Sequence, residues 1–174
     1  MRGAIRLIGL LNAAVWLGSA AFLTFVVAPA FFSAEVGSFL PRPHAGRAAE
    51  VMVGRYFVLH QWCAVVAILH LAAEYVHAGR PIEKWCAGLL STLLLGGLVG
   101  TYWLQPTMHE LQKIRYWPKS TQVQRDEAAH SFGRLHAASQ IVNCLSMVGL
   151  LVYFGHLSRA PVSARYTTMD RARS

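Results

Sequence analysis

Hydrophobic residues gather in four long stretches of this chain, over residues 4–32, 56–77, 85–104 and 135–156. Each stretch has the roughly 20 residues that an α-helix needs to cross about 30 Å of hydrocarbon. Because lipid offers the backbone no hydrogen-bond partners, a spanning segment of this kind is expected to be helical. The pattern predicts an all-α integral membrane four-helix bundle that forms one domain over residues 1–157.

Polar and ionisable residues recur along the second stretch at steps of three and four. They are accompanied by one alanine, and the positions are His60, Cys63, Ala67, His70, Glu74 and His77. On an α-helix this spacing places all six on one side. Ionisable groups are costly in a bilayer, so we expect this side to face the interior of the bundle and to mark candidate functional groups.

The fourth stretch has a polar stripe of its own, with the same helical spacing. Its members are His136, Gln140, Asn143 and Met147. Since ionisable and amide side chains avoid lipid, this stripe should also face the interior. We therefore expect His60 and His136 to lie inside the bundle at similar depth, with His109, Arg55 and Arg134 nearby.

Small residues recur every four positions in the third stretch. They are Gly88, Thr92, Gly96 and Gly100. This arrangement lets helix backbones approach closely in membranes. It predicts a close helix contact, either within the bundle or between protomers.

The connections between the stretches differ in character. Residues 33–54 carry prolines and glycines and are predicted to form a loop with a short surface helix, whereas residues 78–83 form a tight turn. Residues 158–174 show no periodicity, which predicts a disordered basic tail.

The connection over residues 105–132 is predicted to be a helical hairpin that extends from the third and fourth spans. Met108, Leu111 and Ile114 keep helical spacing after Pro106, and Pro118 ends that run. Thr121 with Gln124 has the spacing of a capping box that opens a helix running to His156, roughly 50 Å long. Val123 and Phe132 are expected to meet the three apolar residues across this hairpin, which would project from the membrane and offer a partner-binding surface.

Composition supports the bilayer as the main partner. Charged residues make up 14% of the chain, against about 25% in soluble domains. The net charge of +8 is spread over loops and tail without a nucleic-acid motif, so phospholipid headgroups account for it better than nucleic acid. The three cysteines are an odd number in apolar surroundings and indicate no disulfide framework. The first stretch is too long for a secretory signal and is expected to remain as a span.

Four spans place both termini on one side of the membrane. The sixteen Lys and Arg residues divide eight to eight between the two sides, so the positive-inside rule does not decide the orientation. The basic N-terminus and the arginines of the tail favour cytoplasmic termini, with the bacterial inner membrane as the expected location.

Two cofactor sites are compatible with the polar stripes. His60 and His136, on different helices, are a candidate axial pair for haem b. Glu74-x-x-His77 with His70 has the one-face geometry of a metal site for zinc, iron or copper. One alternative is structural, because polar side chains inside membrane bundles commonly hydrogen-bond across helices simply to satisfy one another. Another is a pathway for protons, a quinone or a substrate.

Several short motifs resemble the transmembrane protein 205-like family. They are Trp16-Leu17-Gly18, the segment 25–32, Gly54-Arg55-Tyr56-Phe57, Gln105-Pro106 and the segment 132–139 with Asn143. The resemblance implies a four-helix integral membrane domain with no established reaction. Its signature positions fall on Pro29, Arg55, Pro106, His136 and Asn143.

The sequence favours a non-enzymatic membrane module or an accessory subunit of a larger membrane complex, because it contains no catalytic constellation. The alternative is a haem- or metal-binding protein that uses the stripe of the second span for redox chemistry or metal handling. A small transporter is less favoured, since no internal repeat is evident to build a pathway.

Overall fold

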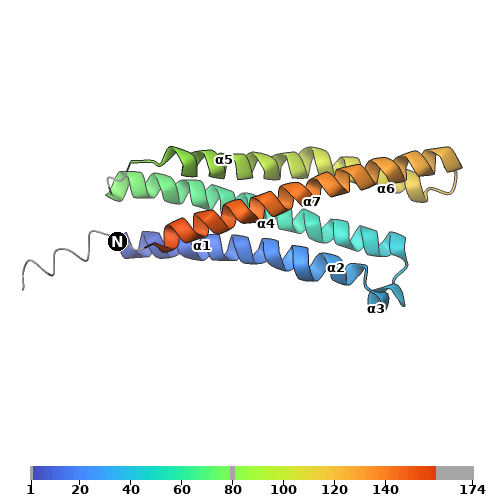
Figure 1. Ribbon diagram of the computed structural model, residues 1–174, viewed down its shortest axis with the longest axis horizontal. Coiled ribbons are helices and arrows are strands. Elements are labelled where there is room, and N and C mark those ends of the chain that lie inside the picture. The colour runs from blue at the N-terminus through green and yellow to red at the C-terminus, as the bar shows by residue number, and fades with distance from the viewer. Residues whose placement is uncertain (1, 79–80, 160–174) are drawn as a thin grey trace, which may run out of the picture.

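The computed structural model describes residues 2–78 and 81–159, and most of the predicted basic tail lies outside these ranges. The described residues form helices joined by short turns (Figure 1). In chain order the elements are α1 (Arg2–Phe22), η1 (Leu23–Val27), α2 (Ala28–Phe31), α3 (Ala34–Gly37), α4 (Arg42–Ala78), α5 (Lys84–Val99), η2 (Gly100–Leu104), α6 (Gln105–Tyr116) and α7 (Gln122–Ser158). The all-α prediction is confirmed.

Four of the resulting rods are long and apolar enough to cross a membrane. They cover Gly3–Gly37, Arg42–His77, Lys84–Tyr116 and Gln122–Ser158, with mean hydropathies between 1.5 and 1.9 over their most apolar windows. Each contains one of the four predicted stretches. The protein is therefore a four-span integral membrane bundle.

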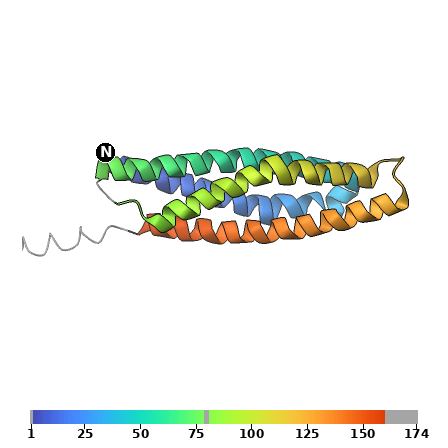
Figure 2. The ribbon, with the colours of Figure 1, turned by 90° about the horizontal axis from the view of Figure 1, so that it is seen from above.

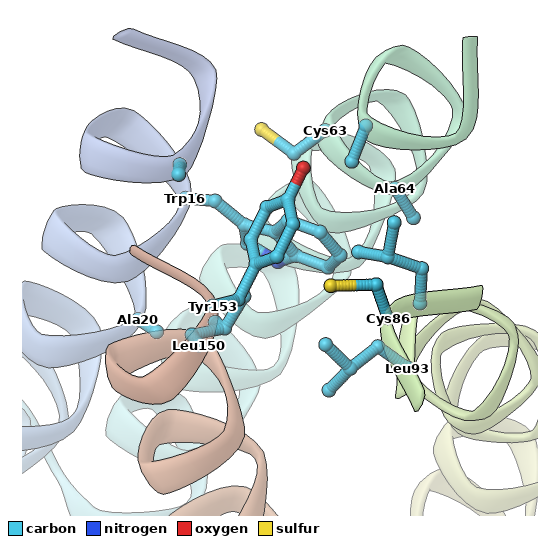
Figure 3. Close-up of a cluster of buried hydrophobic side chains, with 11 residues drawn as sticks. Trp16, Ala20, Cys63, Ala64, Cys86, Leu93, Leu150 and Tyr153 are labelled. Carbon is cyan, nitrogen blue, oxygen red and sulfur yellow. The ribbon is translucent and has the colours of Figure 1, made fainter. Parts of the chain in front are cut away.

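Large apolar side chains cover the outside of the bundle, and small ones fill much of its centre. Phe25, Trp62 and Leu145 are more than 60% exposed, as suits a surface solvated by lipid. The buried core instead contains several alanines around four large side chains, Trp16, Leu90, Leu150 and Tyr153 (Figure 3). Small residues at the helix contacts let the backbones approach, which is how membrane helices gain packing energy in the absence of a hydrophobic drive.

Both termini of the bundle lie at the same end, which we call the terminal end; the opposite end, with the α6–α7 loop, is the hairpin end (Figure 1). The guanidinium of Arg6 donates hydrogen bonds to the carbonyl oxygens of Ser158 at 3.2 Å and Arg159 at 2.9 Å. A cation at the last carbonyls of a helix satisfies their open acceptor sites and complements the helix dipole. Arg6 thus ties the start of α1 to the end of α7.

The first and third spans are each interrupted by a π-helical turn, η1 and η2. Each turn ends two residues before a proline, Pro29 in the first case and Pro106 in the second. Proline has no N–H to donate and clashes with the carbonyl four residues earlier. A widened turn relieves that conflict while the chain continues as a helix.

A threonine five residues before each proline links the interrupted span to another helix. Asn143 of α7 donates to Thr24 Oγ1 at 2.8 Å, and Gln61 of α4 donates to Thr101 Oγ1 at 2.9 Å. The two threonines and the two prolines are each 77 residues apart in the sequence. The same threonine–proline spacing therefore accompanies both π-helical turns.

Helix α4 begins well before the predicted second span. The segment predicted as a loop, 33–54, contains the single turn α3 and the first turns of α4, which starts at Arg42. Proline is tolerated in the first turn of a helix, so Pro43 opens α4 rather than breaking it. The start of α4 consequently extends beyond the apolar stretch 56–77.

The predicted helical hairpin from the third and fourth spans is present. Thr121 caps α7 with its hydroxyl, and Gln124 returns a side-chain hydrogen bond to the Thr121 backbone at 2.9 Å, which completes the capping box. Figures 1 and 2 show the α6–α7 hairpin extending beyond the ends of α2 and α4. Val123, however, is 67% exposed, so it does not contribute the predicted contact across the hairpin.

Candidate functional site

His60, the first histidine of the α4 stripe, is buried and has both ring nitrogens occupied. Trp16 Nε1 donates to His60 Nδ1 at 3.0 Å, and His60 Nε2 lies 2.8 Å from the carbonyl oxygen of Leu93. Since Nδ1 accepts, the proton sits on Nε2 and is donated to Leu93. His60 therefore ties α1, α4 and α5 together, and this arrangement leaves neither nitrogen for a haem iron.

His136, the second half of the predicted haem pair, lies on the exposed surface of α7. Its ring stacks on Phe132 with centroids 5.8 Å apart. Asn143, seven residues further along the same predicted stripe, reaches Thr24 of η1, so only part of this stripe faces the interior. The structure does not bring His60 and His136 together.

His109 lies apart from His60, next to Arg47 and Glu50 at the start of α4. His109 Nδ1 is 3.1 Å from Glu50 Oε2 and 2.9 Å from Arg47 Nη1. Arg47 pairs with Glu50 at 2.7 Å within α4, and His109 Nδ1 faces this pair from α6. The predicted convergence of three histidines at this face is not found.

The predicted metal triad of His70, Glu74 and His77 is spread along α4. His70 is buried beside Gly9, and its Nε2 has no hydrogen-bond partner among the described residues. His77 is exposed, with Nδ1 3.1 Å from the carbonyl oxygen of Ala73 on its own helix. Glu74 is half-buried and lies within electrostatic range of Cys86 and Tyr153. The three side chains do not converge on one point.

The small residues of the third span divide into two groups. Gly88, Thr92 and Gly96 are exposed, and a Cβ at either glycine would meet nothing within 4 Å. Gly100 is buried against Phe57. Gly97, which lies outside the predicted stripe, is also buried and packs on His60. Close contact within the bundle is thus made by Gly97 and Gly100, and a contact between protomers through Gly88, Thr92 and Gly96 stays a prediction.

A different group of metal-ligand side chains meets at the terminal end. Glu83, Cys86 and His156 each offer one ligand atom, and these atoms all lie within 4.8 Å of one another. Glu83 directly precedes α5, Cys86 follows in its first turn, and His156 lies in the last turn of α7. The cluster therefore joins the beginning of one span to the end of another.

Neighbouring residues hold two of these side chains in place. Trp85 Nε1 donates to Glu83 Oε2 at 2.6 Å, and its ring meets the ring of His156 edge-on with centroids 4.9 Å apart. The same carboxylate oxygen lies 3.5 Å from His156 Nε2. Cys86 is 2% exposed and points toward Tyr153 (Figure 3). Trp85 thus orients both the carboxylate and the imidazole.

Sequence reasoning missed this cluster for an identifiable reason. Glu83 and Cys86 are three residues apart, which places them on one face of a helix start, and that signal was available. His156 is 70 residues further along the chain, and its approach depends on how α7 packs against α5. Periodicity within one span does not report such a meeting.

Comparison with known proteins identifies a family for this chain but no reaction. No curated protein matches this chain, and no solved structure matches it. One family model matches residues 11–116, a range that includes Glu83 and Cys86 and ends before His156. Since this match covers more than half of the chain, the chain belongs to the family described as Domain of unknown function (DUF4149).

Proposed function

We propose that this protein is a metal-binding membrane protein whose centre consists of Glu83, Cys86 and His156. The observation that carries the proposal is the approach of three different ligand types, from two helices, to within 4.8 Å of one another. A thiolate, an imidazole and a carboxylate together suit a borderline transition metal such as Zn²⁺, and the thiolate also suits copper.

The spacing of the groups supports a shared ion. Ligands at roughly 2.0–2.3 Å from a tetrahedral zinc lie about 3.3–3.8 Å from each other. The 3.5 Å between Glu83 Oε2 and His156 Nε2 falls in that range. The Trp85 hydrogen bond to Glu83 is the kind of outer contact that orients a metal ligand.

Local charge also favours a cation at this position. Glu83 brings a carboxylate into the cluster, and its Oε2 lies 3.5 Å from His156 Nε2. An ion pair between Glu83 and protonated His156 would account for two of the three cluster members. The Cys86 thiol beside them would then serve only to pack in the core.

The three cysteines of the chain permit a matched test. The purified protein would be loaded with Co²⁺, whose thiolate charge-transfer absorption reports sulfur coordination, and Zn²⁺ stoichiometry would be measured by elemental analysis. We expect Cys86→Ser to abolish the thiolate absorption and His156→Ala to weaken Zn²⁺ binding by about 10-fold or more.

Cys63→Ser and Cys144→Ser are the controls, since one thiol is buried elsewhere in the core and the other is exposed. Both should retain the cobalt spectrum of the unaltered protein. A spectrum that survives Cys86→Ser, or one that is equally sensitive to all three cysteines, would refute the centre.

We propose a second role, as an accessory subunit that contacts a partner through the tip of the α6–α7 hairpin. The supporting observation is exposed apolar surface that lies outside the predicted apolar stretches. Trp117 is 49% exposed and Val123 is 67% exposed. Because Arg125 donates to the carbonyl oxygens of Trp117 and Pro118, both at 3.2 Å, it maintains the tip and is a poor position for testing docking.

Val123→Lys tests this role without disturbing the tip. A complex purified from native membranes should lose its partner in this variant and keep it in Asp126→Lys, which alters an exposed position on the same helix. Equal partner retention in the two variants would rule out docking at Val123.

We also propose a narrower family relationship and an orientation in the membrane. We infer a transmembrane protein 205-like relationship from motif residues that serve the fold: Pro29 and Pro106 follow the π-helical turns, and Asn143 bonds Thr24. We infer cytoplasmic termini in a bacterial inner membrane from the basic N-terminus and tail. Reporter fusions at each end of the protein would test the orientation.

A further inference from the structure

A groove of about 310 Å³ opens at the hairpin end of the bundle, on one face of α4. It lies away from the Glu83 cluster, at the opposite end of the spans. Six of its seven lining residues come from α4 and one from α6: Arg47, Glu50, Val51, Gly54, Arg55, Val58 and Gln105. The α4 members repeat at helical spacing, so the groove follows the helix axis.

The floor of the groove is fixed by Gln105. Its side-chain Nε2 donates to the carbonyl oxygen of Glu50 at 3.2 Å and lies 2.6 Å from the position that a Cβ at Gly54 would take. A larger residue at 54 would displace the amide. The missing side chain at Gly54 therefore lets α6 lie close to α4 beneath the groove.

The charge of the groove is net positive. Its one carboxylate, Glu50, is engaged by Arg47 at 2.7 Å and by His109 at 3.1 Å. Arg55 is exposed and forms no ion pair or side-chain hydrogen bond with any residue that the structure describes. One guanidinium is thus available for an anion from outside the protein.

Position along α4 indicates where that anion comes from. Arg55 directly precedes the apolar stretch 56–77, so we expect its guanidinium to lie where this stretch meets the lipid headgroups. Val58, three residues further into the stretch, lines the same groove and is 48% exposed. A ligand that fits both residues carries a phosphate next to a hydrocarbon chain.

We propose that this groove binds an anionic phospholipid, with Arg55 pairing with the phosphate and Val58 contacting the start of an acyl chain. A guanidinium pairs with phosphate oxygens through two parallel hydrogen bonds. Basic pockets beside membrane helices are known sites for lipid headgroups. A free phosphate ion would not contact Val58, so the groove fits a phospholipid better than a free phosphate.

The test uses the full chain in detergent with phosphatidylglycerol or phosphatidylcholine, and native mass spectrometry to count retained lipid. We expect the unaltered protein to prefer phosphatidylglycerol. Arg55→Gln should lose that preference by about fivefold, the scale of one basic residue near a lipid surface. Arg42→Gln is the control, since it removes the same charge from an exposed position of α4 that does not line the groove.

Three results would overturn the proposal. They are equal retention of the two lipids, equal losses in Arg55→Gln and Arg42→Gln, and displacement of the lipid by an equimolar amount of glycerol phosphate, which would indicate a site for free anions. If Arg55→Gln fails to fold, the lipid comparison and the glycerol phosphate competition on the unaltered protein decide the matter.

Discussion

The indole N–H of Trp16 donates a hydrogen bond to Nδ1 of His60 at 3.0 Å, in the centre of the bundle. Each group would be costly to bury alone, and together they join α1 to α4. The remaining nitrogen of His60 reaches Leu93 on α5, so one side chain connects three spans. This relationship makes His60 a structural residue and separates it from the other histidines of its stripe.

Replacement of His60 should therefore destabilise the bundle more than the same change at His70. Both histidines are 5% exposed, but His70 Nε2 has no partner among the described residues. We expect His60→Leu to lower the free energy of unfolding by about 1–3 kcal/mol, because it leaves the buried Trp16 N–H without an acceptor. His70→Leu should be neutral or stabilising. Unfolding in mixed micelles measures both. Equal losses would contradict the different roles assigned to them.

Two adjacent glycines of α5 provide a second matched pair. A Cβ at Gly97 would lie 2.5 Å from His60 Cδ2, whereas a Cβ at Gly96 would meet nothing within 4 Å. Gly97→Ala should cost about 1–3 kcal/mol through overpacking, and Gly96→Ala should leave the fold intact. Thermal unfolding of the two variants checks this. A stable Gly97→Ala protein would show that His60 moves aside freely.

The bond between Asn143 and Thr24 should contribute a measurable coupling. A double-mutant cycle with Asn143→Ala and Thr24→Val is expected to yield about 0.6 kcal/mol, the typical value for a hydrogen bond between membrane helices. Thr24→Ser serves as the control because it keeps the hydroxyl. Zero coupling in the cycle would mean that the 2.8 Å contact contributes nothing to the stability of the bundle.

The capping box at Thr121 should stabilise the projecting start of α7. Thr121→Ala removes the hydroxyl that accepts from the Gln124 N–H at 3.3 Å. A lost cap costs about 1 kcal/mol, and the loss should stay local to the first turns of α7. Hydrogen exchange would show faster exchange near residues 122–126 and unchanged exchange near Tyr153. Faster exchange throughout the helix would contradict a local role.

Local and length-dependent features of this protein could be read from its sequence. The four spans follow from the length of the apolar stretches, since about 20 residues must cross the hydrocarbon. The capping box at Thr121 involves residues three apart, so its spacing is visible in the chain. The common end of the two termini follows from an even number of spans, and the Arg6 bonds to α7 confirm it.

Tertiary structure alone decided which polar residues meet. Periodicity placed His60, His70 and His77 on one side of a helix, but only packing against α1 and α5 gave His60 two partners and left His70 Nε2 with none among the described residues. The rotation of α7 exposed His136 and brought His156 beside Glu83. The reason is that spacing along the chain determines which residues share a helix face, whereas contacts between faces depend on how each helix is rotated and crossed by its neighbours.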